Sequence, residues 1–195
     1  MEDFLIAIHF GKNDLLTSCV RLAYRDLQRT VRGVSRYDKG GIPNRVRDLV
    51  TEAKQARTQA EFDQWHQAAC QQLIEAFRNT GYQHFTVGHA QKWFNMTLKY
   101  VFVLGDRIAG YEHLFGYCHV PLDQFVMSMA VSLGLPKLPG TGAWSTLNDY
   151  GVYMERQRWF RARPEPPLVT EFRLWLDYVS TQSRNASNLR AQQKT

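Results

Sequence analysis

Apolar side chains recur along most of the chain at intervals of three and four residues, which is the spacing that places them on one face of an α-helix. No segment has a convincing alternation of apolar and polar residues; at most, residues 5–9 could form a strand. Helices are predicted over 14–32, after Pro43, from Thr58 to 81, over about 88–104 and 123–133, after Ser145, and around 172–179. The pattern therefore predicts an all-α fold, a compact bundle of seven to eight helices.

Several helix ends carry recognisable signals. Thr58 is followed three residues later by Glu61, as in a capping box, and Pro43 suits the first turn of a helix. Asp123 follows a proline turn and is expected to cap the helix that begins there, and Ser145 is expected to cap the next one. Gly33 is suited to end the first long helix.

The length of 195 residues fits one domain with a real core. We assign residues 1–182 to this single helical domain. Residues 183–195 are polar and lack apolar anchors, so they are predicted to form a disordered tail. The two prolines and two glycines within 135–142 indicate a rigid surface loop.

Basic residues outnumber acidic ones, 24 to 18, which gives a formal charge of +6. Both ends are basic, with eleven Lys/Arg against seven Asp/Glu before Thr58 and eight against four from Val152 onward. Such an excess favours an anionic partner, and nucleic acid fits better than a membrane. A soluble basic protein whose charges only prevent aggregation explains the balance equally well. Arginines at 21, 25, 29 and 32 form a stripe that either faces phosphates or is simply solvated.

The cysteines at 19, 70 and 118 are far apart and odd in number, so neither disulfides nor a thiolate metal cluster is indicated. His66 and Cys70 share one helix face, yet no further ligand lies nearby in the sequence, and we expect no metal and no cofactor. The N-terminus has too short an apolar run for export, and no segment approaches bilayer length. These features predict a cytoplasmic, soluble protein with no membrane association, and we expect a monomer.

Candidate chemistry centres on Lys92 and Asp123. Lys92 falls in an apolar run with Trp93, Phe94 and Met96, surroundings that favour a reactive amine. Asp123 offers a carboxylate at a helix start. Such a pair suits attack on a sugar anomeric carbon, with the amine as nucleophile and the carboxylate assisting, and needs no metal. The alternative is an ordinary surface lysine near a helix cap.

The segment from Gly88 to Met127 resembles the catalytic core of helix-hairpin-helix DNA glycosylases, in which a lysine opening one helix is followed by a Val/Pro-Val-Asp motif that starts another. Val120-Pro-Leu-Asp123 is similar to that motif, the separation is 123 − 92 = 31 residues, and Lys99 follows one heptad after Lys92. These features are nearest to the archaeal 8-oxoguanine DNA glycosylase branch.

The resemblance implies the helix-hairpin-helix glycosylase fold and a DNA glycosylase, with or without AP-lyase activity, that flips out and excises a modified base. By the same resemblance Lys92 is the Schiff-base nucleophile and Asp123 its partner, and Lys99 competes for the first role. Excision would serve base excision repair or defence against phage with modified DNA. The hairpin here, Phe85-Thr-Val-Gly88, has one glycine where the family usually has two.

Further residues are assigned to the substrate on this basis. The base pocket is expected to be lined by Gln91, Trp93 and Trp144. DNA contacts are expected from Gly88, His89, Lys99, Arg156, Arg158, Arg161 and Arg163. For tryptophan the competing interpretation is a place in the core, and for the arginines it is a solvated surface.

Two other functions stay open. Arg107 and His113 have the Arg-x5-His spacing of HEPN ribonucleases, which are also small and helical, and such a pair could activate a ribose hydroxyl and stabilise the scissile phosphate. Alternatively, the chain is a non-catalytic helical adaptor that binds nucleic acid, in which Lys92 and Asp123 have only structural roles.

Overall fold

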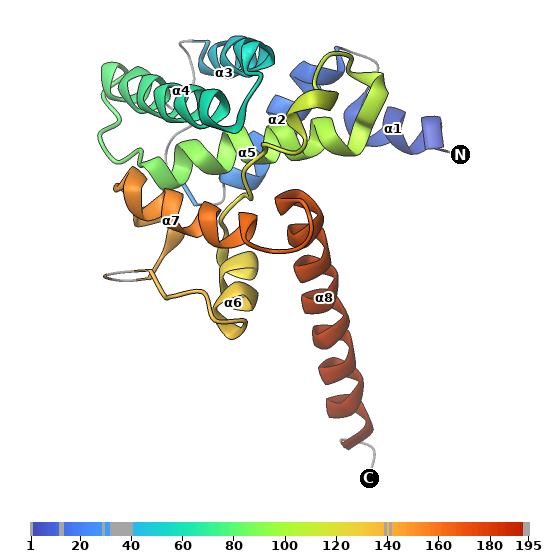
Figure 1. Cartoon of the computed structure of the whole chain (residues 1–195). Coiled ribbons are helices and arrows are strands. Elements are labelled where there is room, and N and C mark those ends of the chain that lie inside the picture. The colour runs from blue at the N-terminus through green and yellow to red at the C-terminus, as the bar shows by residue number, and fades with distance from the viewer. Residues whose placement is uncertain are drawn as a thin grey trace.

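Helix α5 (Val87–Leu104) lies at the centre of the fold, with the other helices arranged around it (Figure 1). Every residue from Val87 to Leu98 is buried, including the polar ones. A helix that is covered on all sides must be surrounded by other elements, which explains the central position.

The computed structural model describes residues 2–11, 14–28, 30–31, 41–138, 140 and 142–192, with side chains only between residues 6 and 180. Besides α5 these residues form α1 (Glu2–Phe10), α2 (Leu15–Gln28), α3 (Ile42–Glu52), α4 (Gln59–Asn79), α6 (Gln124–Ser132), α7 (Tyr150–Arg161) and α8 (Pro167–Gln192). Short 3-10 turns are η3 (Ala53–Gln55), η4 (Gly105–Arg107), η5 (Glu112–Leu114) and η6 (Trp144–Thr146). Within the described ranges no strand occurs, so the all-α prediction is confirmed.

Residues 5–9, the only stretch considered for a strand, are helical and belong to α1. The helix is held by Ile6 and Phe10, four residues apart on one face, which both pack against the core. The Phe10 ring meets the Tyr100 ring edge-on at 6.1 Å. In this short segment, the helical spacing of Ile6 and Phe10 therefore determines the structure, and the alternation of apolar and polar residues over 5–9 does not.

Helix α2 packs along α5, as the buried stripe of its sequence requires. The Trp93 ring lies 4.7 Å from the Tyr24 ring, and its indole N–H donates to the carbonyl of Val20 at 3.0 Å. On the other side, α4 contributes a buried stripe that includes Phe62 and Phe77. These contacts fix the orientation of α5 about its own axis.

The predicted helix starts are mostly confirmed. Pro43 lies in the first turn of α3, and the Thr58 side chain accepts from the amide of Glu61 at 3.2 Å. Asp123 caps α6 by accepting from the amide of Val126 at 2.9 Å. The described part of α2 ends at Gln28, and residues 29 and 32–33 lie outside the described residues.

The prediction that Ser145 caps a helix is wrong. Ser145 lies in η6, and α7 begins at Tyr150, where Asp149 accepts from the amide of Val152 at 3.1 Å. The Ser145 carbonyl instead accepts from the Thr86 hydroxyl at 2.8 Å. The segment around Ser145 is therefore held against the start of α5, and the α-helix begins only at Tyr150.

Helix α8 packs through its first part against α6 and α7, and it then extends toward the C-terminus (Figure 1). Its backbone is helical as far as Gln192, and side chains beyond residue 180 lie outside the described residues. The division at residue 182 and the disordered tail over 183–195 stay predictions. None of the helices in the described ranges has the length and apolar content needed to cross a bilayer.

Gly88, in the first turn of α5, is packed directly against the backbone of η6. Its amide donates to the carbonyl of Leu147 at 2.8 Å, and a Cβ atom on Gly88 would lie 1.9 Å from the carbonyl oxygen of Trp144. The glycine therefore permits the close approach of these two segments.

Replacing Gly88 by alanine is expected to lower the free energy of unfolding by about 1–3 kcal/mol, because the new methyl group forces η6 away from α5. Chemical denaturation followed by circular dichroism measures this change. Gly116→Ala is the matched control, because a Cβ at Gly116 meets nothing within 4 Å. Equal stability of the two variants would contradict the proposed packing.

Candidate functional site

Lys92 and Asp123 meet in the structure. The Lys92 ammonium on α5 donates to a carboxylate oxygen of Asp123 at 2.7 Å, and the side chains are 6% and 20% exposed. Asp123 uses its other oxygen to cap α6. The two residues lie 31 positions apart in the chain, so this contact is a product of the fold.

The register of the pair is set by the residues immediately before it. The Gln91 side-chain amide donates to the carbonyl of Leu122 at 3.0 Å, and its oxygen accepts from the Leu122 amide at 3.1 Å. Because Gln91 precedes Lys92 and Leu122 precedes Asp123, this two-point clamp places the lysine beside the carboxylate.

A second glutamine holds the other end of the same segment. Gln157 on α7 accepts from the Val120 amide at 2.8 Å and donates to the Val120 carbonyl at 2.9 Å. Residues 120–122 are buried and belong to no helix, so their backbone groups need partners. The two glutamines supply them.

Lys99 forms a second buried ion pair with Glu171 of α8 at 2.7 Å, with side chains 12% and 2% exposed. Burial raises the pKa of Glu171, although the charge of Lys99 opposes this, and the charges of Asp123 and Lys92 also act on it. The two lysines and two carboxylates thus form one electrostatically coupled cluster. Lys99 lies inside it and not on an exposed face where phosphates could be reached.

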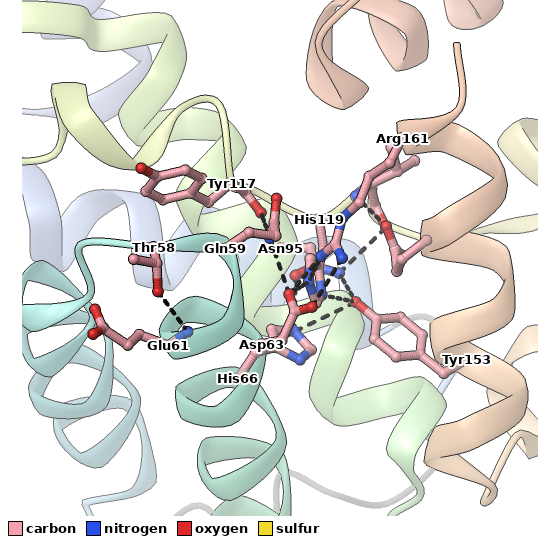
Figure 2. A network of polar contacts seen from close by, with 12 residues as sticks. Thr58, Gln59, Glu61, Asp63, His66, Asn95, Tyr117, His119, Tyr153 and Arg161 are labelled. Carbon is pink, nitrogen blue, oxygen red and sulfur yellow. Dashed lines mark hydrogen bonds and ion pairs between the residues drawn. The ribbon is translucent and has the colours of Figure 1, made fainter.

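Figure 2 shows a polar network that the sequence analysis missed. The Tyr153 hydroxyl accepts from the Asn95 amide at 2.9 Å and lies 2.8 Å from Nδ1 of His119. Nε2 of His119 lies 2.8 Å from Asp63, whose carboxylate also accepts two hydrogen bonds from Arg161. The network joins α4, α5, α7 and the segment before Asp123.

The histidines of the network are buried and neutral at pH 7. Burial lowers the pKa of His119 to about 4, although its hydrogen bond to Asp63 opposes this, and burial also lowers the pKa of His66. Burial acts to raise the pKa of Asp63, but hydrogen bonds from His119 and Arg161 outweigh it and hold that pKa well below its usual range. Arg161 and Asp63 therefore form the charged pair, and His119 links it to Tyr153.

Asn95 connects the network to the clamp. Its amide donates to the Gln91 side-chain oxygen at 3.0 Å, and its oxygen lies 3.0 Å from Nε2 of His66. The chain of contacts thus runs from Asp63, through His119 and Tyr153, to Asn95 and Gln91. The spacing of Gln91, Asn95 and Leu98 places them on one face of α5, but no sequence pattern identifies the hydrogen-bond partners of the two polar side chains.

The residues predicted to line a base pocket separate into two groups. Gln91 and Trp93 are fully buried, and their polar groups are bonded within the protein, so in this structure they offer no surface to a base. Trp144 is half-buried and borders a cavity of about 710 Å³ between α6 and the loop that follows it.

Gly88 and His89, predicted to contact phosphates at the start of α5, form hydrogen bonds within the protein instead. The Gly88 amide is bonded to Leu147, and Nδ1 of His89 accepts from the Thr86 amide at 3.1 Å, which completes a capping box. Burial lowers the pKa of His89 to about 4, so the ring is uncharged at pH 7 and supplies no cation.

The four arginines predicted to contact DNA fall into two groups, those bonded within the protein and those exposed to solvent. Arg156 is buried and donates to the carbonyls of Val152 and Lys137, and Arg161 is bonded to Asp63. Arg158 and Arg163 are exposed, and Arg163 stacks on the Trp159 ring at 3.7 Å. Only the exposed two present their charge to a partner in this structure.

Arg107 and His113 do not share a helix. They lie in η4 and η5, separated by Gly110 with φ +87°. Nε2 of His113 lies 2.7 Å from the Arg57 guanidinium and 3.1 Å from the carbonyl of Ala56. The alignment that the Arg-x5-His spacing presupposes is therefore not formed by one continuous helix.

In the part of the chain that the structure describes, no group of three or more His, Cys, Asp or Glu side chains is placed to hold a metal ion. The three cysteines are buried and unpaired, and burial raises the pKa of Cys118 to about 12.

No protein-family model, no curated protein and no solved structure matches this chain. The site must therefore be interpreted from its own geometry.

The clamp can be tested with Gln91→Leu. This change removes the partners of the Leu122 amide and carbonyl and is expected to lower the free energy of unfolding by about 3 kcal/mol, because buried backbone groups are left unbonded. Gln67→Leu, on an exposed position of α4, is the matched control. Urea titrations compare the two; a Gln91→Leu protein as stable as the control would contradict the clamp.

Stability is expected to fall on acidification. The pKa values of His89 and His119 lie near 4 in the folded protein, against 6.5 as the ordinary value, so the unfolded chain binds protons first. The free energy of unfolding should be constant above about pH 7 and fall between pH 6.5 and 4, by about 2 kcal/mol per group at pH 5. Urea titrations across this range measure the slope.

His89→Gln isolates one contribution, because glutamine at the same position can complete the capping box without titrating. This variant should have a shallower decline below pH 6.5 than the wild type. His84→Gln, at an exposed position, serves as control and should keep the wild-type slope. Identical slopes for all three proteins would show that His89 does not resist protonation.

Proposed function

We propose that the protein is a DNA glycosylase that excises a modified base, with Lys92 as nucleophile and Asp123 as assisting carboxylate. The observation that carries this proposal is the 2.7 Å contact between them. An amine and a carboxylate, each fixed by a helix and largely excluded from water, form the arrangement that attack on an anomeric carbon needs.

The reaction follows from the positions of these two groups. Asp123 accepts a proton from the Lys92 ammonium, and the freed amine forms a bond to C1′ of the deoxyribose. The glycosidic C1′–N bond breaks, and its electron pair leaves with the base, which takes the proton that Asp123 holds. The new amine then passes a proton to O4′ as the C1′–O4′ bond opens, which leaves a protonated Schiff base between Lys92 and C1′.

The charge of the protein supports a nucleic-acid substrate. The net charge is +6, and Arg158 and Arg163 are exposed at the C-terminal end of α7. Exposed cations favour phosphate contacts, while reaching C1′ requires the nucleotide to be rotated out of the duplex. The resemblance to 8-oxoguanine glycosylases makes oxidised guanine the first base to test, and both base excision repair and defence against phage with modified DNA fit such an activity.

Sodium borohydride trapping on duplexes that carry 8-oxoguanine or alkylated, deaminated and hypermodified bases tests the proposal, because hydride reduces the Schiff base to a stable covalent link. Lys92→Arg keeps the cation beside Asp123 but forms no Schiff base, so trapping should be abolished. Lys99→Arg is the matched control and should still be trapped. This comparison also distinguishes the two lysines as nucleophile.

Three outcomes would contradict the proposal in different ways. Trapping that survives Lys92→Arg but not Lys99→Arg would move the nucleophile to Lys99. DNA binding without excision or trapping would favour the adaptor. Cleavage of RNA that depends on Arg107 and His113 would favour the ribonuclease. Thermal melting of each variant confirms that the comparison concerns folded proteins.

A further inference from the structure

A cavity of about 710 Å³ lies between α6 and the loop that leads to η6. One face of α6 forms its wall through Gln124, Met127, Ser128 and Val131, which are spaced as successive positions on a single helix face. Trp144 borders the cavity from η6. Its volume is in the range that encloses small organic ligands.

The wall of this cavity is connected through the chain to the ion pair, and neither Lys92 nor Asp123 borders the cavity itself. Gln124 follows Asp123 directly, and Met127 lies one helical turn after Asp123. On the other side, the backbone of Trp144 rests on Gly88, and Lys92 lies one turn further along the same face of α5. The cavity wall and the ion pair therefore share the start of α6, and the cavity is connected to the first turns of α5 through Trp144.

Three polar side chains that border the cavity are unbonded within the described part of the chain, whereas the Thr30 hydroxyl donates to the Leu27 carbonyl. Among the described residues, the Gln124 amide, the Ser128 hydroxyl and the Trp144 indole N–H make no side-chain hydrogen bond, whereas the side-chain amides of Gln91 and Gln157 are bonded within the fold. The Lys137 side chain borders the cavity and is exposed. The three unbonded groups are therefore available to a ligand in the cavity.

We propose that this cavity, and not the positions of Gln91 and Trp93, receives the extruded nucleobase, a proposal that rests on the glycosylase function proposed above. The Gln124 amide offers one donor and one acceptor side by side, which matches an N–H beside a C=O on an oxo-purine or oxo-pyrimidine edge. The Trp144 ring supplies an apolar surface for stacking. Gln124, Ser128 and Trp144 are then the residues that determine which base is accepted.

The neighbouring cavity, of about 730 Å³, is less suited to the base. It lies at the start of α5, where His89 and Thr86 are bonded to each other, and it borders Arg78 and His84. No residue adjacent to Asp123 in the chain borders it. The cavity of about 710 Å³ is therefore the better candidate for the base, because its wall includes Gln124, which follows Asp123 in the chain.

The experiment compares two substrates for each variant. One duplex carries the modified base that the wild type excises, and the other carries a preformed abasic site, which needs no base pocket. Gln124→Ala and Trp144→Ala should each lower kcat/KM for excision at least tenfold, while borohydride trapping on the abasic duplex stays within twofold of wild type. Ser132→Ala, on α6 but outside the cavity wall, is the control and should change neither reaction.

The outcomes separate this inference from the proposed function. Excision by Gln124→Ala and Trp144→Ala at the wild-type rate would overturn the assignment of the cavity alone. A wild type that neither excises nor traps any duplex would overturn the glycosylase, and the base pocket with it. Trapping on abasic DNA with no base released from any duplex would leave a lyase without a base pocket. Equal losses of excision and abasic trapping would assign the two residues to DNA binding or folding.

Discussion

The central constraint on this fold is that α5 carries polar and charged side chains into the middle of the molecule. Gln91, Lys92 and Asn95 are at least nine-tenths buried. A buried donor or acceptor without a partner costs about 1–3 kcal/mol, so each of these groups requires a partner in a fixed place. Their partners come from the segment that leads into α6, from α7 and from His66 of α4, so the positions of these elements are tied to α5 by polar contacts as well as by apolar packing.

This constraint also explains why the charges occur in pairs. Removing a charge from water costs several kcal/mol, and an opposite charge recovers this only in close, well-bonded geometry. Lys92 has Asp123 and Lys99 has Glu171, each at 2.7 Å. Hydrophobic residues of similar volume would often stabilise a core equally well, so stability alone gives little reason to keep two such pairs. Asp123 is the more exposed of the two carboxylates, 20% against 2%, and the proposed glycosylase function therefore assigns Asp123 and not Glu171 to the reaction.

Much of the fold could be predicted from the sequence because helical periodicity and helix caps are local signals. Thr58 and Asp123 cap helices as expected, since an N-cap requires only its own side chain and an amide three residues on. Ser145 was misassigned because its carbonyl is bonded to Thr86, 59 residues earlier in the chain. A contact over that separation leaves no trace in the local pattern.

The site was predictable only in part for the same reason. Lys92 and Asp123 are recognisable by residue type and by position near helix starts, but the clamp by Gln91 is not, because a glutamine in a helix is usually solvated. The sequence around Trp93 does not distinguish a tryptophan in the core from one in a binding pocket. The hydrogen bond from its indole N–H to the Val20 carbonyl places it in the core. For both Gln91 and Trp93, the role of the side chain depends on a backbone group that lies far away in the sequence.

The buried network gives the clamp a rigidity that two hydrogen bonds alone would not have. Asn95 bonds Gln91 on one side and Tyr153 on the other, so a rotation of the Gln91 side chain would break contacts in both directions. Networks of this kind stabilise one arrangement when every member is bonded. Because Gln91 sets the position of Leu122, and Leu122 precedes Asp123, the distance between the amine and the carboxylate is controlled from α7 as well as from α5. Under the proposed glycosylase function, the substrate would meet a pair whose geometry is already fixed, which is the condition under which positioning lowers a reaction barrier.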